Sequence, residues 1–286
     1  MYLLVLVILV RSRVPLIFCQ NTIASSDSWI FDRLARYVLR RSTVFVREAA
    51  SQQWLATQGV SAALGVDTAF LLAHPEPRHM DIVRNVIAVV PTSLSDWHRD
   101  FRSFDDRRLL LEQLPRELSR IANEHRMEVM IVPHLYGVDS ERLLLDQMCR
   151  GLASLGCPVT IAPVTSYQQF VDALSAATVV VSMRYHGLIV AALGGTPCVS
   201  ICYENKMVDA SRYLAMERLA LPANDIRDGD IYDRVSAALV DRQGISSRLD
   251  SRTQALRKIA MAPILDSLSR LLRNPRFEVS HRPPDE

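Results

Sequence analysis

Short apolar runs alternate with amphipathic segments over most of the chain after residue 85. The apolar runs occupy residues 86–91, 128–134, 158–163, 179–181 and 199–203. Apolar residues at helical spacing fill the intervals, as in residues 106–126, 140–155 and 167–176. Strands that alternate with helices of this length form βαβ units. The pattern therefore predicts an α/β fold with a parallel sheet.

The first seventy residues show a shorter version of the same alternation. Residues 14–20 and 44–47 are expected strands, and residues 28–41 have the apolar spacing of a helix. A second helix is expected up to Gly59, with Ser51 as its N-cap. Residues 73–78 contain two prolines and no periodicity, which favours a linker.

This organisation predicts three parts. We expect a partial N-terminal α/β domain at residues 1–75 and a C-terminal α/β domain at residues 76–245. Residues 246–286 are expected to hold a C-terminal helix and a disordered tail.

The chain starts with ten residues, MYLLVLVILV, that end at Arg11 and Arg13. This run is too short to cross a bilayer as a helix. It also lacks the basic segment that precedes the apolar core of a signal peptide. We expect a buried strand or helix fragment here, with a membrane-associated segment as the alternative.

Composition excludes several classes of protein. The chain is 49% apolar and 22% charged, which is typical of a globular protein, and its net charge of +2 gives no basis for binding nucleic acid. The five cysteines form no CxxC pair, so a reducing cytoplasm is the expected setting. Neither a zinc-ligand spacing of histidines nor the GxxxxGK[ST] motif of P-loop enzymes is found.

Candidate chemistry gathers after two of the predicted strands. Arg184 and His186 follow residues 179–181, and Lys206 follows residues 199–203. Ligands of parallel sheets bind at the carboxyl ends of strands. Arginine offers a planar fork for carboxylate or phosphate, and histidine transfers protons near neutral pH. These residues predict a site for an anionic substrate, although a purely structural polar turn also fits the pattern.

Several segments in the same order resemble the polysaccharide pyruvyl transferase family. The resemblance rests on Arg184-Tyr185-His186, on Gly195-Thr196-Pro197 and on Tyr203 with Lys206 just beyond. It extends to Val132-Pro133-His134 with Asp139, to Val46-Arg47-Glu48 with Ser51, Leu55 and Gly59, and to Asp67 with Phe70-Leu71-Leu72. The resemblance covers about residues 14–213.

Membership would imply a GT-B-like fold, in which two Rossmann-like domains face each other across a cleft. Such enzymes transfer pyruvate from phosphoenolpyruvate onto two hydroxyls of a sugar as a ketal, without a metal or an organic cofactor. The acceptor would be a cell-surface polysaccharide or its lipid-linked precursor, at the cytoplasmic side of the membrane. Peripheral membrane association is a separate expectation, which rests on the apolar run at residues 1–10.

The resemblance also assigns roles to residues. Arg184 and Lys206 would each hold an anionic group of phosphoenolpyruvate, and His186 would act as general acid and base. Ser182, His134, Arg47 and Tyr203 are the further substrate-binding candidates. A core or capping role for His134 and a structural ion pair for Arg47 remain open alternatives.

The chain departs from the family pattern near its start. Family members carry a glycine-rich loop after the first strand, whereas this chain has no glycine before Gly59. We therefore expect a shortened N-terminal domain on the acceptor side. Two other functions stay open: a GT-B glycosyltransferase that uses a nucleotide sugar, and a catalytically inactive truncated homologue in an exopolysaccharide pathway.

Overall fold

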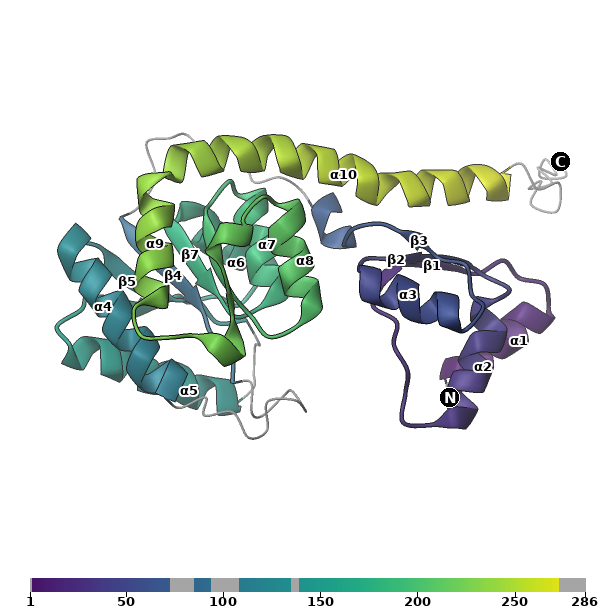
Figure 1. Ribbon diagram of the computed structural model, residues 1–286, viewed down its shortest axis with the longest axis horizontal. Coiled ribbons are helices and arrows are strands. Elements are labelled where there is room, and N and C mark those ends of the chain that lie inside the picture. The colour runs from purple at the N-terminus through teal and green to yellow at the C-terminus, as the bar shows by residue number, and fades with distance from the viewer. Residues whose placement is uncertain (1, 73–84, 94–107, 135–138, 273–286) are drawn as a thin grey trace, which may run out of the picture. The chain divides into compact units, whose positions relative to one another are not determined.

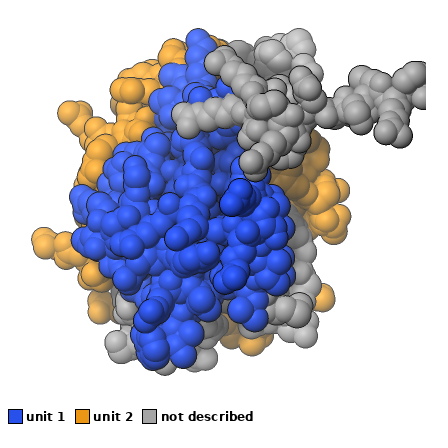
Figure 2. Space-filling view, turned by 90° about the vertical axis from the view of Figure 1, so that its right-hand side faces the viewer, with its two compact units in different colours: residues 1–71, 255–286 blue, residues 72–254 orange. Residues whose placement is uncertain are grey.

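The computed structural model describes residues 2–72, 85–93, 108–134 and 139–272. The chain divides into two compact units, and Figure 2 colours them separately. Unit 1 comprises Met1–Leu71 and Ala255–Glu286, and unit 2 comprises Leu72–Gln254. Each unit has its own parallel sheet, which confirms the predicted α/β fold. The expected linker at residues 73–78 lies outside the described residues.

The sheet of unit 2 has six parallel strands in the order β6-β5-β4-β7-β8-β9 (Figure 1). The strands are β4 (Val86–Val90), β5 (Glu128–Ile131), β6 (Val159–Ile161), β7 (Val179–Ser182), β8 (Cys198–Cys202) and β9 (Ala220–Pro222). This is the doubly wound order of Rossmann folds, which reverses direction between the first and fourth strands. The switch point of this unit therefore lies between β4 and β7.

Helices cover both faces of this sheet. A π-helical segment, Arg108–Gln113, leads into α4 (Leu114–His125), and the other helices are α5 (Asp139–Ser154), α6 (Tyr167–Ala176), α7 (Tyr185–Leu193), α8 (Asn205–Tyr213) and α9 (Asp230–Val240). Helix α4 packs against α5 and α9, whereas α7 packs against α6 and α8. Because both faces are covered, every residue of β4, β7 and β8 is buried, and these strands are mainly apolar in the sequence, with Ser182 and Ser200 as their polar residues.

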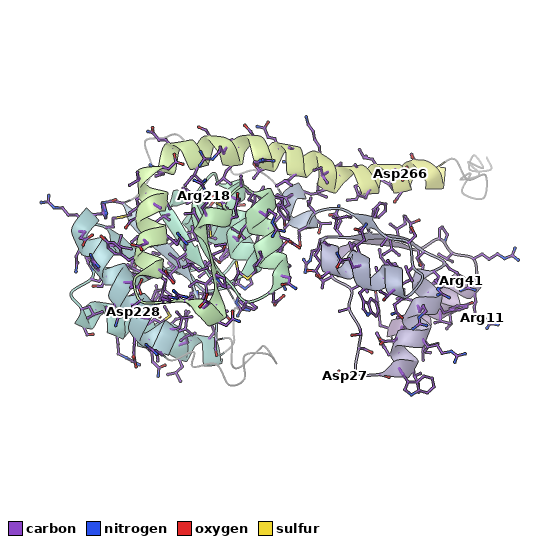
Figure 3. All side chains as sticks on the ribbon, viewed as in Figure 1. Arg11, Asp27, Arg41, Arg218, Asp228 and Asp266 are labelled. Atoms are coloured by element: carbon purple, nitrogen blue, oxygen red, sulfur yellow. The ribbon has the colours of Figure 1, made fainter. Side chains whose placement is uncertain are left out.

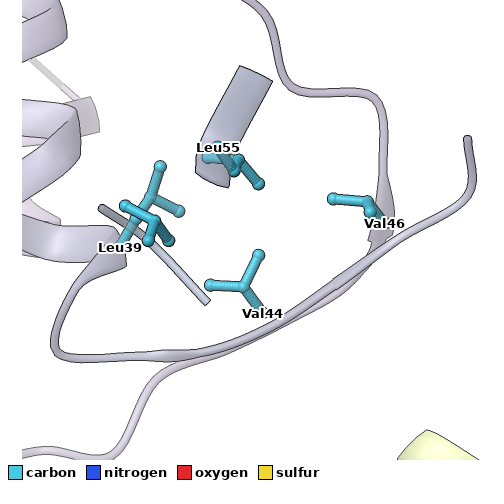
Figure 4. Close-up of a cluster of buried hydrophobic side chains, with 5 residues drawn as sticks. Leu39, Val44, Val46 and Leu55 are labelled. Atoms are coloured by element: carbon cyan, nitrogen blue, oxygen red, sulfur yellow. The ribbon is translucent and has the colours of Figure 1, made fainter. Parts of the chain in front are cut away.

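Unit 1 has a smaller parallel sheet in the order β1-β2-β3. Its strands are β1 (Ile17–Asn21), β2 (Thr43–Val46) and β3 (Ala63–Leu64), and its helices include α2 (Trp29–Leu39) and α3 (Ala49–Thr57). Ser28 is the N-cap residue of α2, because its side chain accepts a hydrogen bond from the Phe31 amide. The core gathers Leu39, Val44, Val46, Leu55 and Val60 (Figure 4).

Two expectations for unit 1 are wrong. Ser51 does not cap α3: Glu48 takes the N-cap position, and Ser51 is buried one turn further on. Its hydroxyl donates to Glu48 Oε1 at 2.8 Å and accepts from the Ile23 amide at 2.9 Å. The N-terminal segment is also not buried. It forms helix α1 (Tyr2–Arg11), and none of its residues is buried because the helix packs on α2 along one side.

The last helix, α10 (Arg242–Leu272), joins the two units in sequence, since its first part belongs to unit 2 and the rest to unit 1. Within unit 1, Gln20 donates a hydrogen bond to the Ala260 carbonyl at 2.8 Å. In the part of the chain that the structure describes, no helix is both long enough and apolar enough to cross a membrane.

Candidate active site

The turn after β7 places two of the candidate residues at the switch point of unit 2. Ser182 ends the strand, is fully buried, and closes the turn through its hydroxyl. That oxygen accepts from the Arg184 amide at 3.1 Å and donates to the Arg184 carbonyl at 2.8 Å. Arg184 has extended backbone and is the N-cap residue of α7, so His186 lies in the first helical turn. Ser182 shapes the turn that presents the other two side chains.

Gly187 lets α7 approach this turn closely. An added Cβ at Gly187 would overlap the Ser182 hydroxyl and would lie 3.3 Å from Ser182 Cβ. A side chain at this position must therefore push α7 away from the end of β7.

We expect Gly187→Ala to lower the free energy of unfolding by about 1–3 kcal/mol because of this overlap. The double variant Gly187→Ala/Ser182→Ala should recover part of the loss, since the overlapping hydroxyl is gone. Gly151→Ala in α5 is the matched control, because its Cβ would meet nothing closer than the Leu111 carbonyl at 3.8 Å. Urea unfolding measures all three, and a loss at Gly151 as large as at Gly187 would contradict the packing argument.

Arg184 is held by a carboxylate of α5, the helix that follows β5 on the other side of β4. Its Nη2 lies 3.5 Å from Glu141 Oε1 on α5, and the two side chains are 15% and 5% exposed. The Nε of Arg184 is buried and has no hydrogen-bond partner within the described residues. Because a buried donor without a partner costs about 1–3 kcal/mol, this nitrogen is suited to an oxygen atom of a ligand.

Two histidines meet beside Arg184. His134 follows β5, and its ring is stacked on that of His186 with centroids 6.3 Å apart and planes 4° apart. Phe170 of α6 meets the His134 ring edge-on at 5.5 Å. His134 Nδ1 is buried without a partner in the described part of the chain, whereas His186 is exposed. His186 is therefore the ring that is open to solvent.

The pKa of His134 is lowered to about 4, first by burial and then by the charges of Arg184 and His186. The folded state therefore keeps His134 neutral at pH values where the unfolded chain already binds a proton. The contribution of His134 to the free energy of unfolding is fully present above the unfolded pKa of about 6.5 and is lost as the pH falls towards 4.

We expect the free energy of unfolding of the native protein to fall between pH 6.5 and 4 by about 2 kcal/mol more than that of His134→Gln. The difference is smaller than the full pKa shift would give, because the ring keeps partial contact with solvent. His125→Gln, at an exposed histidine at the end of α4, is the control. Equal pH dependence of the native protein and His134→Gln would show that His134 is not neutral in the folded state.

The second candidate cation lies beyond the next strand. Lys206, in the first turn of α8, forms an ion pair with Glu204, the N-cap residue of the same helix. Its Nζ also lies 5.8 Å from the ring centroid of Tyr185, whose hydroxyl is 3.1 Å from that of Tyr213. Burial raises the pKa of Tyr203, with a smaller contribution from Glu204. Tyr203 therefore stays a neutral hydrogen-bonding phenol.

Arg47 belongs to the other unit. It lies after β2, where it forms an ion pair with Asp67, and its Nε donates to Thr22 Oγ1 at 2.9 Å. Asp67 also accepts from the Ala69 amide at 2.8 Å. Arg47 therefore forms a structural ion pair, which is the alternative to substrate binding that the sequence allows.

Sequence reasoning overlooked the carboxylates of the site. Glu141 and Glu204 pair with Arg184 and Lys206, so both candidate cations already have an acidic partner. Among the described residues no group of three or more His, Cys, Asp or Glu is placed to hold a metal ion. A shallow hollow of about 290 Å³ lies elsewhere, between α6 and the sheet near Met130, and none of the residues that line it belongs to this site.

The arrangement can bind an anion and move a proton. Arg184 supplies a half-buried fork, Lys206 a compact charge, and His186 an exposed imidazole, all at the carboxyl ends of neighbouring strands. The dipole of α7 adds positive potential at its N-terminus, where His186 lies. An anion that binds here must compete with Glu141 and Glu204 for the two cations.

Comparison with known proteins bears on both the family and the fold. The model of the family described as polysaccharide pyruvyl transferase matches residues 7–205. Anabaena Alr3699/HepE, solved in complex with UDP, is similar with a TM-score of 0.61 at 14% identity, over 94% of this chain and 75% of that chain.

Two epimerase structures are similar to this chain with TM-scores in the same range. The UDP-GlcNAc 2-epimerase from Neisseria meningitidis, bound to UDP-GlcNAc, has a TM-score of 0.62 at 11% identity, over 93% of this chain and 72% of that chain. The UDP-N-acetylglucosamine 2-epimerase from Rickettsia bellii has a TM-score of 0.56 at 12% identity, over 96% of this chain and 74% of that chain. At such identities the likeness shows the fold alone, which is the Rossmann-like GT-B type.

Proposed function

The chain belongs to the polysaccharide pyruvyl transferase family, and from this we propose that it transfers pyruvate from phosphoenolpyruvate onto a sugar as a ketal. The acceptor is a sugar of a cell-surface polysaccharide or of its lipid-linked precursor. The reaction takes place on the cytoplasmic side of the membrane, where phosphoenolpyruvate is available.

One observation supports the donor more than any other. Arg184 Nε and His134 Nδ1 are both buried without a hydrogen-bond partner in the described residues, at adjoining positions beside the switch point. Phosphoenolpyruvate carries a carboxylate and a phosphate, whose oxygens would satisfy such groups. Arginine binds planar carboxylate or phosphate with two parallel hydrogen bonds, which suits Arg184 for one of the two anions.

Lys206 suits the second anion. It lies beyond the strand next to that of Arg184 and is a compact point charge, as in many phosphate sites. The ion pairs with Glu141 and Glu204 hold both cations in place before the donor binds. Donor oxygens then replace part of the contact that each carboxylate makes.

The chemistry requires one proton to reach carbon and a phosphate to leave. In this scheme the methylene carbon of phosphoenolpyruvate takes a proton and becomes a methyl group, and the first sugar hydroxyl adds to the central carbon. The bond between that carbon and the phosphate oxygen breaks, phosphate leaves with the electron pair, and the second hydroxyl adds in its place. The two hydroxyl groups release two protons, of which one corresponds to the proton taken up by the methyl group and the other to the proton taken up by the departing phosphate.

We assign these proton transfers to His186. It is exposed at the first turn of α7, and histidine can donate and accept protons near neutral pH. Arg184 and Lys206 stabilise the carboxylate and the departing phosphate. Tyr203 and His134 stay neutral and contact the donor or the sugar through hydrogen bonds.

A second candidate function draws on the structural likeness. Anabaena Alr3699/HepE is described in complex with UDP, and the Neisseria meningitidis epimerase is bound to UDP-GlcNAc. In a nucleotide-sugar enzyme, Arg184 and Lys206 would hold the diphosphate, and Glu141 or Glu204 would accept hydrogen bonds from ribose hydroxyls. The carboxylates beside both cations are the observation that favours this alternative.

A thermal-shift comparison separates the two functions. Phosphoenolpyruvate should raise the melting temperature in a concentration-dependent way, as expected for a ligand that binds the native state. Inorganic phosphate controls for a non-specific anion effect, and UDP- and GDP-sugars test the alternative. Stabilisation by a nucleotide sugar, with none by phosphoenolpyruvate, would overturn the proposed donor.

A further inference from the structure

Helix α1 exposes an unusual amount of apolar surface. Nine of its ten residues are apolar, from Tyr2 to Val10, and no residue of the helix is buried. Leu3, Leu6, Val7, Leu9 and Val10 are half-buried, helix α1 contacts α2, and the other apolar residues of α1 are exposed. The exposed side consists of Tyr2, Leu4, Val5 and Ile8. At 3.6 residues per turn these four fall within one stripe about 160° wide.

The first turn of α2 extends this surface. Trp29, Ile30 and Phe31 are all exposed, and Trp29 and Tyr2 reach 72% and 80% exposure. Both helices begin at the lower end of the unit in Figure 1, so the aromatic residues of the two helix starts lie at the same end. We call these seven residues the α1–α2 surface. Large exposed apolar patches on a folded domain mark interaction sites.

The charged residues around the α1–α2 surface indicate which kind of partner it binds. Between residues 2 and 41 the chain has six arginines, two aspartates and no other charged residue. Arg11 and Arg13 follow the exposed stripe directly and are exposed, as are Arg33, Arg40 and Arg41. Figure 3 shows Arg11 and Arg41 at one end of the helix pair and Asp27 at the other. An apolar stripe with tyrosine and tryptophan and a basic border is the composition of helices that lie on anionic lipid.

The length of α1 limits how it can contact a bilayer. Ten residues make a helix about 15 Å long, half of the hydrocarbon thickness. The helix therefore cannot span, but it can lie in the headgroup region with its stripe towards the acyl chains. Arginine side chains of the border can extend to the lipid phosphates while their stems cover apolar surface.

A second copy of the chain fits this surface less well. A symmetric dimer brings the same surface of two molecules together, so the arginines of one copy would face those of the other. Like charges at short range oppose that contact, whereas anionic headgroups neutralise them.

We propose that the α1–α2 surface docks the protein on an anionic lipid surface, with the stripe of α1 and the first turn of α2 inserted and the arginines at the headgroups. This goes beyond the proposed transfer reaction, because it concerns unit 1 and holds for any donor. It places the enzyme where a lipid-linked sugar would be found.

Co-sedimentation of the full chain with vesicles tests the proposal. The protein should bind vesicles of phosphatidylcholine with phosphatidylglycerol, bind phosphatidylcholine alone at least tenfold more weakly, and lose affinity at high salt. Leu4→Gln/Ile8→Gln and Arg11→Gln/Arg13→Gln should each weaken binding at least tenfold. Val240→Gln/Arg218→Gln is the matched control, since Val240 is 90% exposed and Arg218 is also exposed, both in unit 2.

Tryptophan fluorescence reports which residues insert. The emission should shift to shorter wavelength on anionic vesicles, and Trp29→Phe should remove most of that shift while binding remains. Failure of the native protein to bind anionic vesicles, or equal binding by all variants, would overturn the proposal. So would a dimer in solution that the α1 variants dissociate, because it would assign the surface to a second copy. Stabilisation by phosphoenolpyruvate should be the same in all these variants, so the two proposals fail separately.

Discussion

Replacing Arg184 by alanine is expected to lower the rate of pyruvyl transfer at least a hundredfold. The change removes the fork that binds one anion of the donor, and preorganised charges of this kind contribute about 10²–10³ in rate. It also leaves Glu141, which is 5% exposed, without its cation, so stability should fall by roughly 1–3 kcal/mol. Phosphate release that depends on phosphoenolpyruvate and the acceptor measures the first effect, and urea unfolding the second.

A double variant separates binding from structure. Arg184→Ala/Glu141→Gln removes both members of the ion pair, so it should regain most of the lost stability but none of the lost activity. Arg184→Lys keeps the charge without the fork, so its rate of pyruvyl transfer should lie between the rates of the native protein and Arg184→Ala. Recovery of activity in the double variant would mean that Arg184 serves only to neutralise Glu141.

His186→Ala should lower the turnover number by about 10²–10⁴, the usual contribution of a general acid or base. Because His186 is exposed, the variant should fold with nearly native stability, and the affinity for the donor should change little. The pH dependence that belongs to this histidine should vanish from the residual rate. Steady-state kinetics over a range of pH measure these effects together.

The control for this variant is His125→Ala. His125 is an exposed histidine at the end of α4, before β5, and thus at the opposite edge of the sheet from the site. It should leave the kinetics unchanged. Near-normal turnover in His186→Ala would remove His186 from the proton-transfer steps.

The sequence was sufficient to predict the fold of unit 2 and the position of its candidate site. Strands covered by helices on both faces are mainly apolar rather than alternating, and β4, β7 and β8 are of this kind. Residues that directly follow such a strand must lie at its carboxyl end, so the apolar pattern alone places Arg184 and His186 at that edge of the sheet. The family match over residues 7–205 confirms the resemblance that these residues carried.

The carboxylates of the site could not be predicted in the same way. Glu141 lies in the first turn of α5, where an acidic residue is explained by the helix dipole alone. Its contact with Arg184 joins residues that are 43 positions apart and depends on how β5 and β7 flank β4. The expectation that Ser51 is an N-cap fails for a similar reason: its hydroxyl accepts a hydrogen bond from the Ile23 amide, which is remote in sequence.

Helix α1 shows the limit of apolarity as a guide to burial. Its residues are apolar on every side, a pattern that favours a buried element. In the structure α2 covers one side only, and the other side is exposed. An apolar pattern therefore says that a surface prefers to leave water, but it does not say whether protein or lipid will cover it.

Calorimetric titration of phosphoenolpyruvate into the native protein and into Arg184→Ala/Glu141→Gln is the most direct test of the central claim, that the switch point of unit 2 is the donor site. The native protein should bind one phosphoenolpyruvate per chain, and the double variant should bind it at least tenfold more weakly although it folds normally. Equal affinity of the two proteins, or the absence of binding to both, would contradict the assignment of this site to phosphoenolpyruvate.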